Sequence, residues 1–222
     1  MIDIAVSVLT VPKENAVSVF YNLETAKINY FHIDVMDGKF VENNNLDLMK
    51  DYALTISHIS NTGLDIHLMV NDVEMVMDDY ISLEPQIISF HYEAIKEKDR
   101  IIDIINDIKS NGIKVGMAIN PETSIDQIKE YLPFIHQVIV MTVVPGKGGQ
   151  SLISKTLDKI KELKKYLIDN ELDNVEIEAD GGINDVNAQE VAQSGADILV
   201  SGTYVINSDN YSESVKKLRK EE

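Results

Sequence analysis

The stretch Tyr30-Phe-His-Ile-Asp-Val-Met-Asp-Gly38 is an apolar run that carries two polar side chains, His32 and Asp34, two residues apart. Side chains alternate along a β-strand, so this spacing points both to the same face. The run is rich in the aromatic and β-branched residues that favour strands. We therefore expect a strand that presents a histidine and an aspartate together.

Two other apolar runs carry polar side chains of the same kind. Leu64-Asp-Ile-His-Leu-Met-Val70 contains His67, and Ile177-Glu-Ala-Asp-Gly-Gly-Ile183 contains Asp180. A single histidine or aspartate in such a run more often hydrogen-bonds the backbone than binds a ligand. Four such groups at the ends of three strands favour a divalent-metal site, suited to zinc, manganese, iron or cobalt. The two carboxylates can also move protons on opposite sides of a substrate, which would make the protein an enzyme.

Apolar runs of strand length recur along the whole chain. Most are nearly continuous in isoleucine and valine, as parallel strands covered on both faces are. We expect eight strands, at approximately Ile2–Leu9, Tyr30–Asp34, Leu64–Val70, Gln86–His91, Ile113–Ile119, Gln137–Val143, Val175–Asp180 and Asp197–Ser201.

Segments of helical period separate these runs. Helical spacing is clearest in two sets, Ile101, Ile105 and Ile108, and Ile153, Leu157, Ile160 and Leu167. We expect a further helix to begin near Ser124, after Asn-Pro-Glu-Thr ends a strand. Gly63 and Gly112 precede strands, where a helix end commonly requires positive φ. Asn111-Gly112 is also a hairpin signal, but the long helical pattern before it argues against a hairpin.

Eight strand–helix units in one small domain predict an α/β fold, a (β/α)8 TIM barrel comprising residues 1–222 as a single domain. A doubly wound open sheet is the alternative, because the pattern does not show closure. Functional residues of such barrels gather at the carboxyl ends of the strands. Ser7, Asp34, His67, Met141 and Asp180 all fall near such ends. His91 also ends a strand. It either faces the site or is a satisfied core histidine, and we expect the latter.

Composition and charge exclude several classes of function. Hydrophobic content of 44% and charged content of 26% are ordinary for a globular protein. The net charge of −17 argues against nucleic acid and anionic membranes as partners. An anionic substrate would need a local positive site. There are no cysteines, which excludes disulfides and thiolate ligands. No membrane-spanning run or basic leader is found, so we expect a cytoplasmic protein.

Glycine-rich loops follow the last three predicted strands. They contain Gly146-Lys147-Gly148-Gly149, Gly181-Gly182 and Gly202-Thr203. Glycine lets backbone N–H groups approach an anion, and the last loops of barrels frequently bind phosphate. The first loop alone is a weak signal, since an ordinary flexible loop has the same composition. Three methionines lie near strand ends, Met36, Met69 and Met141. They are either core filling or an apolar lining that excludes water.

Together these segments resemble the ribulose-phosphate 3-epimerase family of metal-dependent (β/α)8 barrels, and the resemblance runs nearly the whole chain. Its motifs are Ser-Val-Leu at Ser7–Leu9, His-Ile-Asp-Val-Met-Asp-Gly-Lys-Phe-Val at His32–Val41, His-Leu-Met-Val at His67–Val70, Phe-His-Tyr-Glu-Ala at Phe90–Ala94, Asn-Pro-Glu-Thr at Asn120–Thr123, Met-Thr-Val-Val-Pro-Gly-Lys-Gly-Gly-Gln at Met141–Gln150, Asp-Gly-Gly-Ile at Asp180–Ile183 and Gly-Ala-Asp-Ile-Leu-Val-Ser-Gly-Thr at Gly195–Thr203.

The resemblance implies a barrel of the ribulose-phosphate-binding type that holds one divalent metal ion (Zn, Fe, Mn or Co). The implied metal ligands are His32, Asp34, His67 and Asp180, with Asp34 and Asp180 as the acid–base pair. The implied substrate-binding residues are Ser7, His67, Gly146, Lys147, Gly148, Gly149, Gly181, Gly182, Gly202 and Thr203. The family also implies a small-molecule sugar phosphate as partner, and a homo-oligomer.

Departures from the family pattern fall in the loops. Lys147 stands where the family commonly has Phe, Val144 where it has Asn, and Glu42 where it has Pro. The usual Ala-Asp is missing around Thr10–Pro12. None removes a proposed ligand or base, so the departures bear on the substrate more than on the reaction.

The expected reaction inverts C3 of a ketose phosphate, converting D-ribulose 5-phosphate to D-xylulose 5-phosphate in the pentose phosphate pathway. The C3 hydrogen is acidic because the neighbouring carbonyl can take up charge as an enediolate, which a divalent cation stabilises as a Lewis acid. The alternatives are the same chemistry on a ketohexose phosphate such as D-allulose 6-phosphate, a related phosphate-binding barrel that cleaves C–C bonds or builds a heterocycle, and a non-catalytic sugar-phosphate-binding barrel.

Overall fold

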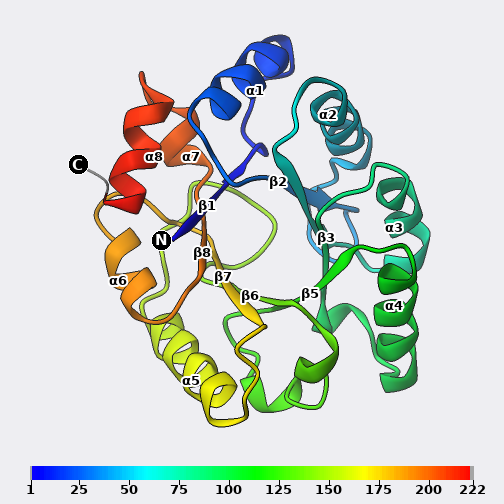
Figure 1. The fold of residues 1–222 in the computed structure, drawn as a ribbon. Coiled ribbons are helices and arrows are strands. Elements are labelled where there is room, and N and C mark those ends of the chain that lie inside the picture. The colour runs from blue at the N-terminus through cyan, green and yellow to red at the C-terminus, as the bar shows by residue number, and fades with distance from the viewer. Residues whose placement is uncertain (1, 221–222) are drawn as a thin grey trace.

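Eight parallel strands close into a barrel in the order β1-β2-β3-β4-β5-β6-β7-β8 in the computed structural model, which describes residues 2–220 (Figure 1). The strands are β1 (Asp3–Ser7), β2 (Tyr30–Met36), β3 (Gly63–Met69), β4 (Ile87–His91), β5 (Lys114–Ile119), β6 (Gln137–Met141), β7 (Glu176–Asp180) and β8 (Ile198–Val200). All eight predicted strands are confirmed, and none of their ends is shifted by more than two residues. Closure of the barrel excludes the open doubly wound sheet.

Helices surround the strands (Figure 1). Within residues 2–220 they are α1 (Ala16–Thr25), α2 (Leu46–Ile59), α3 (Val73–Ile81), α4 (Lys98–Ser110), α5 (Lys155–Asp169), α6 (Ala188–Gln193), α7 (Thr203–Ile206) and α8 (Tyr211–Arg219). The first predicted helical pattern is confirmed, because Ile101, Ile105 and Ile108 are buried on α4. The second is confirmed for Leu157, Ile160 and Leu167 on α5, but Ile153 lies before the helix begins. Each helix in this part of the chain is too short or too polar to span a bilayer.

The helix expected near Ser124 is wrong. The segment between β5 and β6 forms two 3-10 turns instead, Ile125–Gln127 and Leu132–Phe134. Pro133 lies in the second turn. It has no N–H to donate, and its ring excludes a continuous α-helix through this segment.

Only one of the two glycines before strands has the expected conformation. Gly112 follows α4 with φ of +76°, so it ends a helix as predicted and not a hairpin. Gly63 is itself the first residue of β3. A Cβ there would lie 2.9 Å from Gln86 Oε1. Glycine is therefore favoured at this position by close packing and not by the conformation of a turn.

Inward-facing side chains divide the barrel interior into a polar and an apolar part. Apolar residues gather on β5 and β6 (Ala118, Ile139, Met141) and on β1 and β8 (Ala5, Ile198, Val200). Polar residues come from β2, β3, β4, β6 and β7, namely His32, Asp34, Asp65, His67, Ser89, His91, Gln137, Glu178 and Asp180, all buried. Buried polar groups usually have hydrogen-bond partners, yet His32, Asp65, Ser89, Gln137 and Glu178 each keep one side-chain atom without a partner among the described residues.

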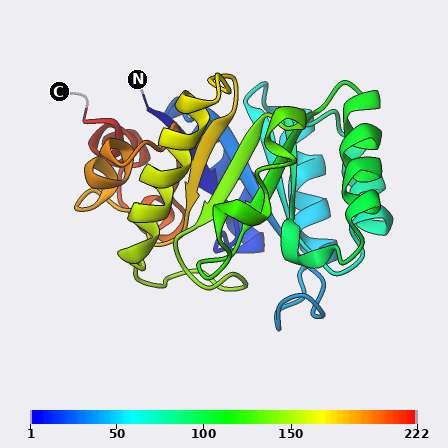
Figure 2. The same cartoon turned by 90° about the horizontal axis from the view of Figure 1, so that it is seen from below.

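Loops at the carboxyl ends of the strands enclose one mouth of the barrel. The loop after β2 projects furthest, on the edge opposite the two termini (Figure 2). Asp37 begins this loop, accepting hydrogen bonds from the backbone N–H of Phe40 within it and of Asn71 after β3. Asn43 donates to the carbonyl oxygen of Gly146 at 2.6 Å, which joins the loop to the glycine-rich loop after β6.

Candidate metal centre and active site

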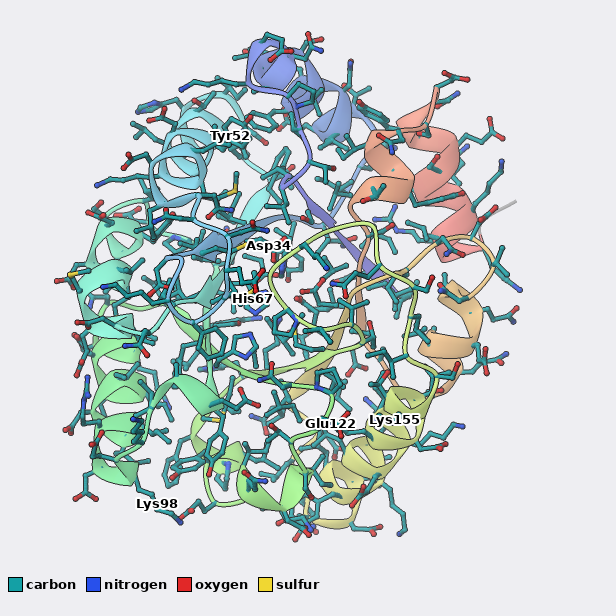
Figure 3. All side chains as sticks on the ribbon, turned by 180° about the vertical axis from the view of Figure 1, so that it is seen from behind. Asp34, Tyr52, His67, Lys98, Glu122 and Lys155 are labelled. Carbon is teal, nitrogen blue, oxygen red and sulfur yellow. The ribbon has the colours of Figure 1, made fainter. Side chains whose placement is uncertain are left out.

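Four buried side chains converge at the carboxyl end of the barrel. His32 and Asp34 come from β2, His67 from β3 and Asp180 from β7, and one ligand atom from each lies within 4.8 Å of all the others. Asp34 and His67 lie together in the centre of the barrel in Figure 3. Parallel pairing sets His67 directly opposite Asp34. Asp180 comes from β7, which pairs with neither β2 nor β3, and it faces them across the interior of the closed barrel.

The distances define a central space between nitrogen and oxygen atoms. His67 Nδ1 lies 3.2 Å from Asp34 Oδ1 and 3.4 Å from Asp180 Oδ2. His32 Nε2 lies 3.3 Å and 3.8 Å from the same two oxygens. Two imidazoles and two carboxylates are a ligand set for a borderline divalent cation.

His32 is oriented by a carboxylate on its other side. Its Nδ1 lies 2.6 Å from Oδ2 of Asp65, its register partner on β3. A carboxylate accepts, so Nδ1 carries a proton, and Nε2 is the ring nitrogen that faces the cluster. Nε2 is fully buried and makes no hydrogen bond to any described residue. A buried ring nitrogen without a hydrogen-bond partner, on an imidazole held by a carboxylate at its other nitrogen, fits a metal ligand.

A second carboxylate, that of Glu178, lies deeper in the barrel. Its Oε1 is 3.3 Å from His32 Nδ1, and Gln137 donates to its Oε2 at 2.7 Å. Burial and the neighbouring charge of Asp65 raise the pKa of Glu178 well above its ordinary value. Both effects favour the neutral form of the Glu178 carboxyl group.

The cluster stabilises positive charge at its centre. Burial alone would raise the pKa of Asp34, but the charge of the neighbouring His32 and the hydrogen bond with His67 hold it well below its ordinary value. Burial alone would lower the pKa of His67, whereas Asp180 and Asp34 raise it. These carboxylates therefore favour a cation between them, whether a proton on imidazole or a metal ion.

His67 has a third partner, His91, on the side away from the cluster. The two Nε2 atoms are 3.0 Å apart, and His91 Nδ1 lies 3.1 Å from Glu93 Oε2. Burial lowers the pKa of His91, which keeps this ring neutral. His91 is buried, as expected of a core histidine. The expectation did not include its contact with His67, a proposed metal ligand.

A pocket of about 630 Å³ opens above the cluster. Asp34, Asp180 and Ser7 lie in its floor, and Ser7 donates to Asp34 Oδ2 at 2.6 Å. The three methionines also line it, as do all the glycines of the predicted phosphate loops with Lys147 and Thr203. His32 and His67 are fully buried beneath this lining. The pocket thus unites the predicted substrate-binding residues, apart from His67.

The loops after β6 and β7 meet at Gly182. Its φ is +69°, and a Cβ there would lie 2.6 Å from the backbone nitrogen of Leu152. Only glycine permits both the conformation and the approach. Lys147 is exposed at the rim, and Glu42 is exposed outside the pocket lining. Of the departures noted in the sequence, Lys147 is thus the one that faces the pocket.

Several pocket and support residues were not predicted. Asn184, Asp185 and Asn187 line the pocket from the loop after β7, and Tyr204 lines it from α7. Asp65 and Glu178 each stand two residues before a predicted ligand, in Asp65-Ile-His67 and Glu178-Ala-Asp180. That is the spacing that singled out His32 and Asp34, so the same rule of alternation finds them.

The sequence profile of the Ribulose-phosphate 3 epimerase family matches residues 3–206. This chain belongs to the ribulose-phosphate 3-epimerase family. Ribulose-phosphate 3-epimerase of Methanocaldococcus jannaschii is 35% identical over 219 residues, covering 99% of this chain and 90% of that protein. The enzyme of the same name from Escherichia coli K12 is 33% identical over 195 residues, covering 86% and 82%. Predicted and observed membership of the family agree.

Solved structures of other barrels share the fold. A 3-keto-L-gulonate-6-phosphate decarboxylase from Vibrio cholerae aligns with a TM-score of 0.74 at 13% identity, covering 99% of this chain and 96% of that one. A 3-hexulose-6-phosphate synthase aligns with a TM-score of 0.73 at 11% identity, covering 99% of both chains. At such identities the likeness shows the barrel alone, whereas the epimerase family is distinguished by sequence.

Proposed function

We propose that this protein is a ribulose-phosphate 3-epimerase that converts D-ribulose 5-phosphate to D-xylulose 5-phosphate. One observation carries the proposal: two carboxylates from different strands, Asp34 and Asp180, meet at a four-ligand cluster and both line the pocket. Inversion at a carbon needs proton donors and acceptors on both of its faces. The names of the curated relatives support the pentose phosphate as substrate.

The proposed cofactor is one divalent metal ion held by His32, Asp34, His67 and Asp180. When bound, it would act as a Lewis acid toward the negative charge that develops on the substrate oxygens as the C3 proton leaves. The donor set admits zinc, iron, manganese or cobalt. The buried, unpartnered Nε2 of His32 and the two facing carboxylates support a cation at this place.

Asp34 and Asp180 are the proposed acid–base pair. One carboxylate removes the C3 proton from one face, and the other side chain, as the acid, returns a proton to the opposite face. The roles exchange when the other epimer is the substrate. Ser7 donates to Asp34 Oδ2 and so fixes the orientation of that carboxylate. A positioned acid or base contributes about 10²–10⁴-fold to the rate.

The rest of the pocket would bind the substrate and exclude water. Met36, Met69 and Met141 form an apolar wall beside the two aspartates. We propose that the glycines at 146, 148, 149, 181, 182 and 202, with Lys147 and Thr203, hold the phosphate. Backbone N–H groups and one lysine offer an anion a local positive site in a chain of net charge −17. Direct contact between His67 and the substrate remains a prediction.

The domain organisation, oligomeric state and location that we propose rest on membership of the family and not on the four-residue cluster. We propose a single catalytic domain over residues 1–222, a homo-oligomer in solution and a cytoplasmic location. A sugar phosphate is the proposed partner.

The proposal is tested by removing the metal with a chelator, restoring each ion in turn and assaying D-ribulose 5-phosphate and D-allulose 6-phosphate separately. We expect turnover of the pentose only in metal-loaded protein. Activity on the hexose alone would replace the substrate and point to Lys147. Full turnover after verified metal removal would reject the metal site.

A further inference from the structure

Two side chains hold the loops after β6 and β7 by backbone carbonyl oxygens. Gln150 donates from Nε2 to the carbonyl oxygen of Val144 at 2.6 Å and to that of Lys147 at 2.9 Å. Thr142, which directly follows β6 and is fully buried, donates from Oγ1 to the carbonyl oxygen of Gly181 at 2.6 Å. In these loops side chains thus supply the donors that backbone N–H groups supply in helices and strands.

The other half of two of these peptide units is an N–H group without a partner. The carbonyl of Lys147 shares its peptide unit with the N–H of Gly148, and the carbonyl of Gly181 shares its unit with the N–H of Gly182. Within residues 2–220, neither N–H group donates to a protein atom. Both glycines line the pocket. Free backbone N–H groups in such a place are typical of an anion site.

Planarity of the peptide unit determines where these N–H groups point. The described peptide units are all trans, so the C=O and N–H bonds of one unit point in opposite directions. Thr142 lies buried outside the pocket lining, whereas Gly182 is part of it. The bond from Thr142 therefore turns the N–H of Gly182 away from the buried side and toward the pocket. Gln150 turns the N–H of Gly148 away from its own amide in the same way.

Thr142 also joins the two loops to each other. Its N–H donates to the carbonyl oxygen of Asp180 at 2.7 Å, and its carbonyl oxygen accepts from the N–H of Ile153 at 2.8 Å. A Cβ at Gly182 would lie 2.8 Å from the carbonyl oxygen of Gln150, so the loops touch there. Glycine has the greatest backbone freedom of all residues, and these side-chain bonds limit that freedom.

We propose that Thr142 and Gln150 are positioning residues for the phosphate group of the substrate. Each holds the carbonyl oxygen of a peptide unit, so that the N–H of Gly182 or Gly148 faces the anion. The inference rests on the phosphate site of the proposed function and adds two residues that act through the backbone. Without its side-chain donor, such a peptide unit can rotate and turn a carbonyl oxygen toward the phosphate, which repels it.

Titration of the full-length protein with inorganic phosphate tests the inference. The chain has 11 glycines, so labelling with ¹⁵N-glycine gives a simple amide spectrum in which each loop is followed separately. In the wild-type protein the amide proton signals of Gly148 and Gly182 should move downfield as phosphate binds, because a hydrogen bond to an anion deshields the proton. The same titration gives the dissociation constant for phosphate.

Two variants each remove one donor. Gln150→Met keeps the length of the side chain, and we expect phosphate binding to weaken about 10-fold, near the lower end of what one hydrogen bond to a charged group contributes. The shift of Gly148 should shrink while that of Gly182 persists. Thr142→Val should weaken binding to a similar extent with the opposite pattern of shifts. KM for D-ribulose 5-phosphate should rise with the phosphate dissociation constant, by a larger factor than kcat falls.

The controls separate positioning from a general effect on the fold. Thr142→Ser keeps the hydroxyl group and should bind phosphate as the wild-type protein does. Gln189→Met replaces an exposed glutamine on α6 and should also leave binding unchanged. Gln150→Met, in a loop at the pocket rim, keeps the test valid if Thr142→Val does not fold.

Phosphate dissociation constants and glycine shifts in Gln150→Met and Thr142→Val equal to those of the wild-type protein would overturn the inference and leave the phosphate site standing. Wild-type protein that does not bind phosphate through these glycines would reject the phosphate site together with the inference. Wild-type protein that binds phosphate as expected but does not turn over D-ribulose 5-phosphate would reject the proposed function alone, and the shifts in the variants would still decide the roles of Thr142 and Gln150.

Discussion

Asp65 and His32 face each other across β3 and β2, and the register of the two strands places a carboxylate oxygen 2.6 Å from His32 Nδ1. Neither side chain is exposed. This pair fixes the ring of His32 before any ligand arrives, which lowers the cost of ordering the site on binding. The position of His32 in the cluster therefore depends on Asp65 beneath it as well as on the other three proposed ligands.

Asp65→Asn is expected to weaken metal binding by about 10–100-fold, because an amide is a poorer acceptor than a carboxylate and no longer enforces the tautomer of His32. Chelator competition measures the effect. Asp79→Asn, at an exposed aspartate that pairs with Lys50, is the control and should bind metal as the wild-type protein does. Equal affinities in the two variants would contradict the role of Asp65.

Asp180→Asn is expected to abolish epimerisation, with a loss of at least about 10²-fold, while the fold stays intact. An amide cannot return a proton to C3. The assay uses metal-saturated protein with metal content and circular dichroism recorded, since Asp180 is also a proposed ligand. Asp158→Asn on the exposed face of α5 provides the control. Retained turnover in the metal-loaded Asp180→Asn protein would reject the assignment.

Alternation along strands made much of the site predictable, and strand register supplied the rest. His32-x-Asp34 was predicted because both residues interrupt an apolar run. Asp65 and Glu178 have the same spacing relative to His67 and Asp180, yet their partners depend on which strands are neighbours. Contact between His67 and His91 likewise requires the pairing of β3 with β4. One chain's pattern gives the face of each residue but not its partner across the barrel.

Helix prediction failed where proline and a short connection override a local start signal. Asn120-Pro121-Glu122-Thr123 followed by Ser124 is typical of a helix start, and Ser124 does accept from the N–H of Asp126. The turn ends after Gln127, and Pro133 stands in the second turn. The place where a helical turn begins was predicted correctly, but the type and length of the element were not.

Gly116→Ala is expected to destabilise the protein by about 1–3 kcal/mol, because a Cβ there would lie 1.9 Å from Ser89 Oγ inside the barrel. Free energies of unfolding from urea titration measure the loss. The double variant Ser89→Gly with Gly116→Ala removes the side chain that clashes, so it should recover most of the stability. A single variant as stable as the wild-type protein would contradict the tight packing.

Glu93→Gln is expected to cost about 1–3 kcal/mol of folding free energy at neutral pH and less in acid. Burial alone would raise the pKa of Glu93, but hydrogen bonds from His91, Thr123 and Asn120 lower it below its ordinary value. A carboxylate with a depressed folded pKa stabilises the fold fully above its unfolded pKa of about 4.3, and the contribution disappears as pH falls through the folded pKa. Urea titrations from neutral to acidic pH should show the difference from wild type shrinking. A constant difference would contradict the charged state of Glu93.

The central claim is that Asp34 and Asp180 exchange protons at C3 of a pentose phosphate, and proton exchange in deuterated water tests it most directly. Metal-loaded protein is incubated with D-ribulose 5-phosphate in D₂O while NMR follows C3. The account predicts D-xylulose 5-phosphate with deuterium at C3, in the wild-type protein and not in Asp180→Asn. Epimer formation without deuterium at C3, or no reaction in protein with verified metal content, would contradict it.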